Sequence, residues 1–376
     1  MIVCLALNKI ISLIKINNPV YSDRRPLNES DVADDHRWNF KQRSMDFTKD
    51  LNLKGQYCYH PFNTITIDKF GDIYICICQA WLPVSIGKVT DFNSFEEIVQ
   101  SKRAREIQAS ILDGTYKYCD SNSCTIIRDD QLSKNIGHRK DTIDWINFAL
   151  DDSCNLTCPS CRTEFKFVSE GAEYDYRIAV VNHLAKLIEQ HNVNLKFTLS
   201  GDGDPFASLI YRHFLTNLKL KNNKNIEIEI VTNGVLVKDH WHKMDGVYNN
   251  IVRFKFSFDA GTKEVYEKIR QGGNWDKLLE SVRYIVNWKK SNNLKLTITS
   301  NFVVQTGNYT DMASYVDLCN DLGVDEINFQ KIDNWGTFKD FNGHAVWKND
   351  HPNYQDFLLE LKKINLNKKV NLTNLI

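Results

Sequence analysis

The spacing of hydrophobic residues changes in a regular way from about residue 143 onward. Short apolar runs typical of buried strands are each followed by apolar positions at helical spacing. This alternation predicts a parallel sheet covered by helices, either doubly wound or curled as a partial barrel. The expected strands are 143–150, 195–201, 226–234, 250–261, 294–304 and 324–332, and the expected helices are 177–190, 206–220, 262–270, 275–290 and 309–323.

Four loops directly follow expected strands and carry polar residues. In a parallel α/β sheet, functional side chains gather at the carboxyl ends of the strands. We therefore expect these loops to meet at one rim of the sheet. They are DDSCNLTCPSCRTE (151–164), SGDGDP (200–205), VTNG (231–234) and SFDAG (257–261).

The segment before this alternation has a different pattern. A hairpin is expected at 62–78, with its turn at 69–72, and one helical segment is expected at 94–112. Near the other end, Phe357 and Leu361 share one face of a last helix with Leu358 and Ile364. The expected parts are an N-terminal extension (1–50), a small α+β module (51–140), the alternating part (141–335), and a C-terminal loop and helix (336–376).

The composition is that of an ordinary globular protein. Of the 376 residues, 42% are hydrophobic, and 47 basic residues balance 47 acidic ones. A neutral chain has no net field to steer it onto nucleic acid or an anionic membrane, so neither partner is expected. The apolar start, 1–16, lacks a charged n-region and is interrupted by Lys9. We expect it to dock on the body as a strand or amphipathic helix rather than act as a signal peptide.

Eight of the ten cysteines fall between positions 58 and 161. Such clustering at short spacings in a long chain favours metal binding over disulfides. The two outliers, Cys4 and Cys319, are expected to be small buried hydrophobic residues.

Three thiols lie within eight residues of the first loop, at Cys154, Cys158 and Cys161. Structural zinc is held by four protein ligands, and no fourth Cys or His lies close by in the sequence. A [4Fe–4S] cluster has four irons and takes one thiolate on each. Three thiolates would therefore leave one iron open to an outside ligand, which is a catalytic arrangement.

The spacing C-x-x-x-C-x-x-C after the first strand of an alternating run resembles the radical S-adenosylmethionine (radical SAM) superfamily. The resemblance covers about residues 143–331. It implies a partial (β/α)6 barrel and a catalytic [4Fe–4S] cluster on the three cysteines, with SAM as the ligand of the free iron. In that family SAM is cleaved to methionine and a 5′-deoxyadenosyl radical, which abstracts hydrogen from substrate. The family often has an aromatic residue before the last cysteine; Ser160 stands there, which predicts looser stacking on the adenine.

The second loop resembles the family's Gly-Gly-Glu-Pro segment, which binds the SAM amino group. Gly203, Asp204 and Pro205 fall on this segment, while Asp202 replaces the first glycine. Asp204 is one methylene shorter than Glu, but a carboxylate there can still accept a hydrogen bond from an ammonium group. The alternative is a phosphate-binding glycine loop, which lacks its third glycine because Phe206 stands there.

Two later stretches resemble the segments that approach the rest of SAM. SFDAG and the following YEKIR are similar to a family stretch near the ribose and carboxylate, which implies contacts from Ser257, Asp259 and Arg270. The alternative for Asp259 is a turn residue that caps a helix. SNFVVQTGN is similar to the segment that packs on the adenine, which implies contacts from Val303 and Asn308.

The remaining cysteines resemble a SPASM/twitch module, which binds auxiliary [4Fe–4S] clusters. The full SPASM set has seven cysteines and two clusters, whereas five are present here, so one auxiliary cluster is expected. In the family the module usually follows the barrel, and here it precedes it. Cys78 would share a strand face with Cys76 and could replace it as a ligand; structural zinc is the alternative metal. The implied ligands are Cys58, Cys76, Cys119 and Cys124.

The resemblance implies a radical SAM oxidoreductase that oxidises or cross-links a C–H position of a peptide or protein. An alternative within the same chemistry is a dehydrogenase of a small alcohol, aminosugar or nucleoside. Outside it stand a non-catalytic zinc-binding α/β scaffold and a radical SAM protein that has lost turnover. Oxygen-labile clusters imply a cytoplasmic location and a flavodoxin- or ferredoxin-like electron donor. No residue is assigned as the catalytic acid or base.

Overall fold

The computed structural model describes residues 53–132, 142–199, 201, 203–220, 223–364 and 366–375. All of them belong to one compact unit, Ser44–Ile376. The expectations for residues 1–50, including Cys4, lie outside the described residues, as does Asp202. Among the described residues, no helix has the length and apolar character needed to cross a bilayer.

The described strands form one nine-stranded sheet in the order β2-β1-β3-β4-β5-β6-β7-β8-β9. From β3 to β8 the neighbours pair in parallel and follow one another in chain order. A doubly wound sheet reverses its strand order at a switch point, whereas a barrel does not. The order therefore supports the partial-barrel alternative. The six strands are β3 (Trp145–Ala149), β4 (Leu195–Leu199), β5 (Ile226–Thr232), β6 (Ile251–Ser257), β7 (Thr297–Val304) and β8 (Glu326–Lys331).

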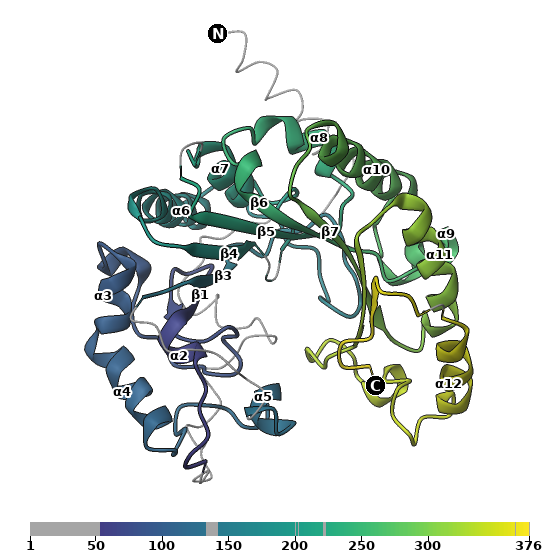
Figure 1. The fold of residues 1–376 in the computed structure, drawn as a ribbon, viewed down its shortest axis with the longest axis horizontal. Coiled ribbons are helices and arrows are strands. Elements are labelled where there is room, and N and C mark those ends of the chain that lie inside the picture. The colour runs from purple at the N-terminus through teal and green to yellow at the C-terminus, as the bar shows by residue number, and fades with distance from the viewer. Residues whose placement is uncertain are drawn as a thin grey trace. The chain divides into compact units, whose positions relative to one another are not determined.

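Helices cover the outer face of this sheet (Figure 1). Along β6, buried Phe254 and Phe256 alternate with the half-buried Arg253 and Lys255, so one face of the sheet is apolar and the other polar. Phe254 packs on Trp241 beneath the helices, with ring centroids 5.5 Å apart. The longer helices of this part are α6 (Ala172–Gln190), α7 (Leu209–Asn217), α9 (Lys263–Ile269), α10 (Trp275–Ser291) and α11 (Met312–Leu322), and the shorter ones are α8 (Val237–His240), η4 (Trp241–Lys243), η5 (Tyr248–Asn250) and η6 (Tyr309–Asp311).

The N-terminal module extends the same sheet. Its strand β1 (Thr64–Asp68) pairs antiparallel with β2 (Ile73–Tyr74) and parallel with β3. The predicted hairpin and its turn at 69–72 are therefore confirmed. The other elements of the module are α2 (His60–Asn63), η2 (Val89–Asp91), α3 (Phe95–Gln100), α4 (Lys102–Leu112) and α5 (Thr125–Arg128).

Two details of the module differ from the prediction. The single helical segment at 94–112 is wrong, because α3 and α4 are separated at Ser101. This residue has an extended backbone, and its Oγ accepts a hydrogen bond from the Ala104 amide, which caps α4. The second hairpin strand ends at Tyr74, so Cys76 and Cys78 lie beyond it and do not share a strand face.

The C-terminal part packs against the end of the barrel. Helix α12 (Tyr354–Lys363) buries Phe357, and Ile364 is buried just past its end. A short strand, β9 (Val370–Asn371), pairs in parallel with β8 and was not predicted. A one-turn helix, η7 (Asn342–His344), precedes α12. Cys319 on α11 is fully buried, which confirms its prediction as a small core residue.

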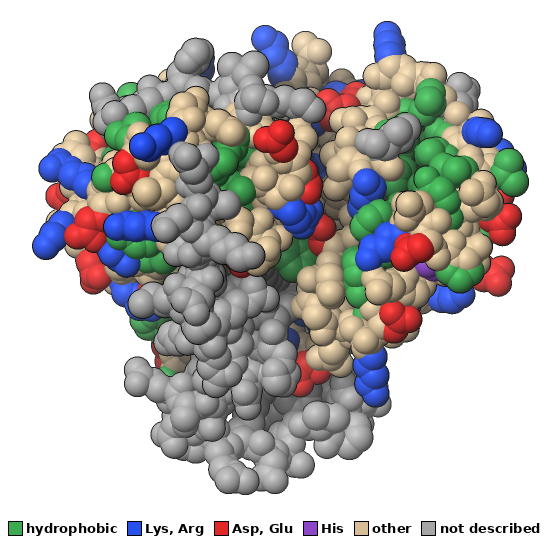
Figure 2. All heavy atoms as spheres, turned by 90° about the horizontal axis from the view of Figure 1, so that it is seen from below, with side chains coloured by type: hydrophobic (Ala, Val, Ile, Leu, Met, Phe, Trp, Pro, Cys, Tyr) green, Lys and Arg blue, Asp and Glu red, His purple; other side chains and the backbone are tan. Residues whose placement is uncertain are grey.

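Charges of both signs are mixed over the face of the molecule that Figure 2 shows. Figure 2 shows described Lys and Arg side chains interspersed with Asp and Glu side chains over the face seen there. This agrees with the balanced composition of the chain.

Candidate cluster and cofactor site

The loop with the three neighbouring cysteines begins directly after β3. Cys154 and Cys158 are buried, and Cys161 is half-buried. The Leu156 amide donates a hydrogen bond to Cys154 Sγ at 3.4 Å, and Cys158 O accepts one from the Cys161 amide at 2.9 Å. Together with Leu156, the three cysteines pack into one small cluster.

Two residues from other loops also direct polar groups to these thiols. Asn233, after β5, donates its side-chain amide to Cys154 Sγ at 3.7 Å. Arg270, after α9, approaches Cys158 Sγ with a guanidinium nitrogen at 3.9 Å. Donors and a positive charge stabilise thiolates, which are the form that binds iron. Burial raises the pKa of Cys154 to about 12, so its thiolate needs such partners or a metal.

These residues fit an iron–sulfur cluster better than one metal ion. In the described residues, no group of three or more His, Cys, Asp or Glu side chains is gathered tightly enough to hold a single ion. Each thiolate of a cubane cluster ligates a different iron, so the three sulfur atoms need not converge on one point.

The loop after β4 lies directly against the cysteine loop. A Cβ atom at Gly203 would stand 2.6 Å from the backbone oxygens of both Asp151 and Ser153. The amide of Asp204 also donates to Ser153 O at 2.9 Å. Only glycine allows this approach, and Pro205 follows in a buried position.

The carboxylate of Asp204 is already engaged within the chain. One oxygen accepts from the amides of Phe206 and Ala207, at 2.9 and 3.2 Å. The other accepts from Thr232 Oγ1 at 2.8 Å and the Asn233 amide at 2.7 Å. Burial raises the pKa of Asp204, while these four donors favour its ionised form. Asp204 thus ties the loop after β4 to the end of β5, and its donors would compete with the predicted SAM ammonium group.

Four of the residues predicted near the ribose, carboxylate and adenine form one network. Asp259 pairs with Arg270 at 2.8 Å and accepts a hydrogen bond from the Val303 amide at 2.8 Å. The Asn308 side-chain amide donates to the backbone oxygens of Asp259 and Val303, at 2.9 and 3.0 Å. Ser257 is half-buried at the end of β6. The network joins the rim after β6 to the rim after β7, with Arg270 also facing the cysteine loop.

The helix-capping alternative for Asp259 is wrong. The amides of Gly261 and Thr262 at the start of α9 donate to Asp311 instead, at 2.6 and 2.9 Å. Asp259 has a positive φ of 60°, an uncommon backbone for a non-glycine residue. Its contacts are therefore with the site rather than with the helix.

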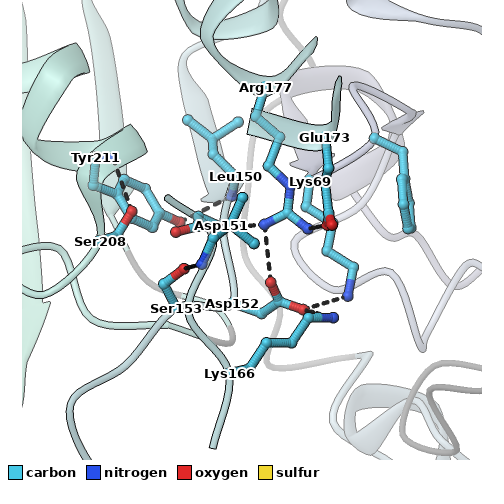
Figure 3. Close-up of polar contacts among 12 residues, drawn as sticks. Lys69, Leu150, Asp151, Asp152, Ser153, Lys166, Glu173, Arg177, Ser208 and Tyr211 are labelled. Carbon is cyan, nitrogen blue, oxygen red and sulfur yellow. Dashed lines mark hydrogen bonds and ion pairs between the residues drawn. The ribbon is translucent and has the colours of Figure 1, made fainter. Parts of the chain in front are cut away.

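A buried charge cluster in front of Cys154 was missed by the sequence analysis. Asp152 contacts Arg177 of α6 at 2.9 Å, Lys69 at 2.6 Å and Lys166 at 2.7 Å (Figure 3). Burial opposes ionisation of Asp152, but these three cations outweigh it and hold its pKa below its ordinary value. The adjacent acids Asp151 and Asp152 were visible in the sequence, but their partners were not. Arg177 also pairs with Asp151 and with Glu173.

Tyr266 was also missed. It is fully buried on α9, and burial raises the pKa of its hydroxyl, with Arg270 and Cys158 among the charged groups that act on it. Its position beside the cysteine loop comes from the helical spacing to Arg270, four residues on.

All four predicted auxiliary ligands line one cavity in the N-terminal module. Its wall is mainly apolar. Cys78 is not among the lining residues. Burial raises the pKa of the Cys76 thiol, and the neighbouring cysteines raise it further. His60 also lines the cavity, and burial lowers its pKa to about 4, so it is neutral. The four lining cysteines are Cys58, Cys76, Cys119 and Cys124.

Four thiols around one hollow fit a fully ligated [4Fe–4S] cluster. A structural zinc would need the same four thiols within bonding distance of a single ion. Together, a parallel α/β partial barrel with three thiols on its rim and a four-thiol cavity beside it are the features of an iron–sulfur protein with two cluster sites.

Comparison with known families agrees with this class. Residues 152–319 match the radical SAM superfamily, and residues 58–125 match SPASM, an iron–sulfur cluster-binding domain. The chain belongs to the radical SAM superfamily and carries its SPASM domain ahead of the barrel. It is a radical SAM enzyme, whose cofactors are a [4Fe–4S] cluster with SAM and an auxiliary iron–sulfur cluster.

Curated relatives are distant and cover only part of the chain. A probable GTP 3′,8-cyclase from Saccharolobus islandicus is 23% identical over 225 residues, which are 60% of this chain and 67% of that protein. One from Methanococcus aeolicus is 27% identical over 195 residues, 50% of this chain and 60% of that protein. The match thus spans about two thirds or less of these relatives.

Solved structures with a similar arrangement are also distant. Streptococcus suis SuiB bound to precursor peptide SuiA is 16% identical, with a TM-score of 0.40 over 74% of this chain and 61% of that chain. TYW1 with a lysine-pyruvate adduct is 18% identical, with a TM-score of 0.35 over 56% of this chain and 68% of that chain.

Proposed function

We propose that this enzyme abstracts a hydrogen atom from a C–H bond of a peptide or protein, and that the net reaction is an oxidation or a cross-link. The observation that carries the proposal is the pairing of two cysteine sets on one sheet. Three cysteines follow β3, and four line a cavity in the N-terminal module. By the number of thiols, a cluster on the first set would keep one open iron, and a cluster on the second set would keep none.

The three cysteines of the first loop would hold the catalytic cluster. When bound there, the cluster and SAM supply a 5′-deoxyadenosyl radical. Abstraction of hydrogen leaves a substrate radical and 5′-deoxyadenosine. An oxidised product then requires this radical to lose one electron and one proton. A fully ligated cluster in the four-cysteine cavity is suited to accept the electron, because it has no open iron for other chemistry.

The rim residues would orient SAM rather than react. Gly203 lets the loop after β4 approach the cysteine loop, and Asp204 fixes that loop against β5. Asp259 and Arg270 hold the end of β7 and the loop after it, where Val303 and Asn308 are expected to meet the adenine. Arg270 lies between Asp259 and Cys158, so its charge would also favour the thiolate.

The SPASM match supports the peptide class of substrate, because the resemblance to SPASM/twitch enzymes implies a peptide or protein substrate. A flavodoxin- or ferredoxin-like protein would donate the electrons that reduce the catalytic cluster.

A small molecule, such as an alcohol, aminosugar or nucleoside, is the second candidate substrate. The curated relatives are named for a reaction of GTP. The polar face of the sheet also carries three partly exposed cations, Lys196, Arg253 and Lys255, around Glu229. With Glu326 paired to Arg253 and Glu227 in register with Lys196, three carboxylates balance these three cations. The names of the relatives are therefore the observation that favours this second candidate.

A substrate screen tests the proposal. The anaerobically reconstituted enzyme would be mixed with SAM, dithionite and either a peptide library or a set of nucleosides and nucleotides, and 5′-deoxyadenosine would be measured. The proposal expects peptides to stimulate its formation and to lose hydrogen by mass spectrometry. Stimulation by nucleotides alone would favour the second candidate. Stimulation by neither, with no 5′-deoxyadenosine at all, would contradict both.

A further inference from the structure

The hairpin turn of the SPASM domain has a rigid shape of its own. One carboxylate oxygen of Asp68 accepts hydrogen bonds from the amides of Phe70 and Asp72, both at 2.9 Å. Gly71 takes a left-handed backbone with φ of 73° and donates to Asp68 O at 2.9 Å. With the backbone fixed in this way, the direction in which the Lys69 side chain leaves the turn is fixed as well.

The turn docks on helix α6 of the barrel. Tyr176 donates its hydroxyl to Phe70 O at 2.6 Å, and a Cβ atom at Gly71 would stand 3.3 Å from a methyl group of Val180. One turn further along the helix, His183 donates to Phe92 O at 2.9 Å. Helix α6 also carries Arg177, so the hairpin turn and the Arg177 guanidinium are both held by this helix.

From this turn, Lys69 reaches the loop in front of the catalytic cysteines. Its amine lies 2.6 Å from the carboxylate of Asp152, and the two side chains are 8% and 0% exposed. Asp152 stands two residues before Cys154 in the chain. Lys166 contacts the same carboxylate oxygen at 2.7 Å, but 37% of its side chain is exposed. Breaking a buried ion pair costs far more than breaking an exposed one, so the Lys69 contact should outweigh the Lys166 contact and act together with the buried Arg177, which contacts the other carboxylate oxygen.

We propose that Lys69 is a positioning residue through which the SPASM domain holds the catalytic-cluster loop, 151–154, in place. This inference rests on the proposed function only where the loop is taken to carry the catalytic cluster; the ion pair itself does not depend on it. A module placed ahead of the barrel thereby acts on the catalytic loop by contact, besides any electron that it accepts.

Hydrogen exchange of the full-length apoprotein tests the positioning. We expect Lys69→Met to speed exchange of the amides in 151–156 by at least about tenfold, because it leaves a buried carboxylate short of a partner. Lys88→Met is the matched control in the same domain, since Lys88 pairs with Asp72 of the turn at 2.8 Å and both side chains are partly exposed. It should change exchange there by less than about twofold. Equal exchange in both variants would overturn the inference.

Labelling of lysine amines in the wild-type protein tests the same contact without a mutation. Lys69 should be acetylated at least about tenfold more slowly than Lys88, because its amine is buried in an ion pair. Asp152→Asn should remove much of this protection. Acetylation of Lys69 as fast as that of Lys88 would overturn the inference, even if Lys69→Met failed to fold.

A spectroscopic comparison separates this inference from the proposed function. In reconstituted protein, SAM should change the EPR spectrum of the reduced cluster, and Lys69→Met should need about tenfold more SAM than Lys88→Met for the same change. No response to SAM in wild type would refute the proposed function and leave the exchange and labelling tests standing. A wild-type response that Lys69→Met reproduces at the same SAM concentration would refute the role of Lys69 alone.

Discussion

Replacing Arg177 by Met tests whether the charge cluster holds the catalytic loop. Its guanidinium is 1% exposed and contacts two carboxylates that are fully buried, Asp151 and Asp152, together with Glu173. Three cations and three carboxylates form the cluster when Lys69 and Lys166 are included. Removing Arg177 leaves Asp151 without a cation and the cluster with an excess negative charge.

The free energy of unfolding that Arg177→Met should remove follows from the burial of the ion pairs. Breaking a buried ion pair by removing one partner costs about 3–5 kcal/mol. A folded unit of this size loses roughly 0.7 kcal/mol per degree near its midpoint, so the melting temperature should fall by about 4–7 °C. Arg103→Met is the control, because Arg103 and Glu106 are each 41% exposed. An exposed pair contributes about 0–1 kcal/mol, which corresponds to no more than about 1–2 °C.

The assay is thermal unfolding of both variants and wild type, followed by circular dichroism at one scan rate. Arg177→Lys should lie between the two, because a point charge cannot serve three carboxylates as a planar fork does. A shift for Arg177→Met no larger than that for Arg103→Met would refute the view that this cluster supports the loop.

Three further predictions concern the rim, the cavity and the hairpin. Gly203→Ala should lower stability by about 1–3 kcal/mol in thermal unfolding and weaken SAM binding, because its Cβ would stand 2.6 Å from two backbone oxygens; an unchanged midpoint would contradict this. Cys78→Ser should keep the auxiliary irons, whereas Cys124→Ser should lose about four per chain on reconstitution, and equal losses would count against the assigned ligands. Burial, and then Asp72, raise the pKa of Asp68 to about 6 in the folded protein. Between about pH 4 and 6 the folded protein therefore binds more protons than the unfolded chain. The stability that this protonation contributes is lost as the pH rises through 6. Asp68→Asn should therefore be more stable relative to wild type at pH 8 than at pH 5, by about 1–3 kcal/mol in urea unfolding of the apoprotein; the opposite order would show that the charge is not buried at a cost.

The strands of the barrel could be predicted because each has a local apolar pattern. The same reasoning failed where a local pattern was weak or misleading. Strand β9 has two residues, too few for a periodicity, and the helix pattern at 94–112 continued through Ser101, whose hydroxyl caps the following helix instead. That β1 joins the barrel sheet beside β3 depends on a pairing between distant segments, which no local pattern reveals.

The residues of the site could likewise be predicted only where a local sequence pattern marks them. The cysteines were found because their spacing within one loop is itself the signal. Lys69 was not, because its partner Asp152 is 83 residues away and a lone lysine in a turn has no distinguishing pattern. The competition for Asp204 was hidden for a related reason, since Thr232 and Asn233 come from the next strand along the sheet.

The most direct test of the account is a count of iron and sulfide after anaerobic reconstitution, with 5′-deoxyadenosine measured in the same samples after SAM and dithionite are added. The comparison is between wild type and a variant with Cys154, Cys158 and Cys161 changed to Ala. The account predicts about eight irons falling to about four in the variant, with 5′-deoxyadenosine made by wild type alone. About four irons falling to none would leave the catalytic cluster but remove the auxiliary one. No iron and no 5′-deoxyadenosine in wild type would contradict the account as a whole.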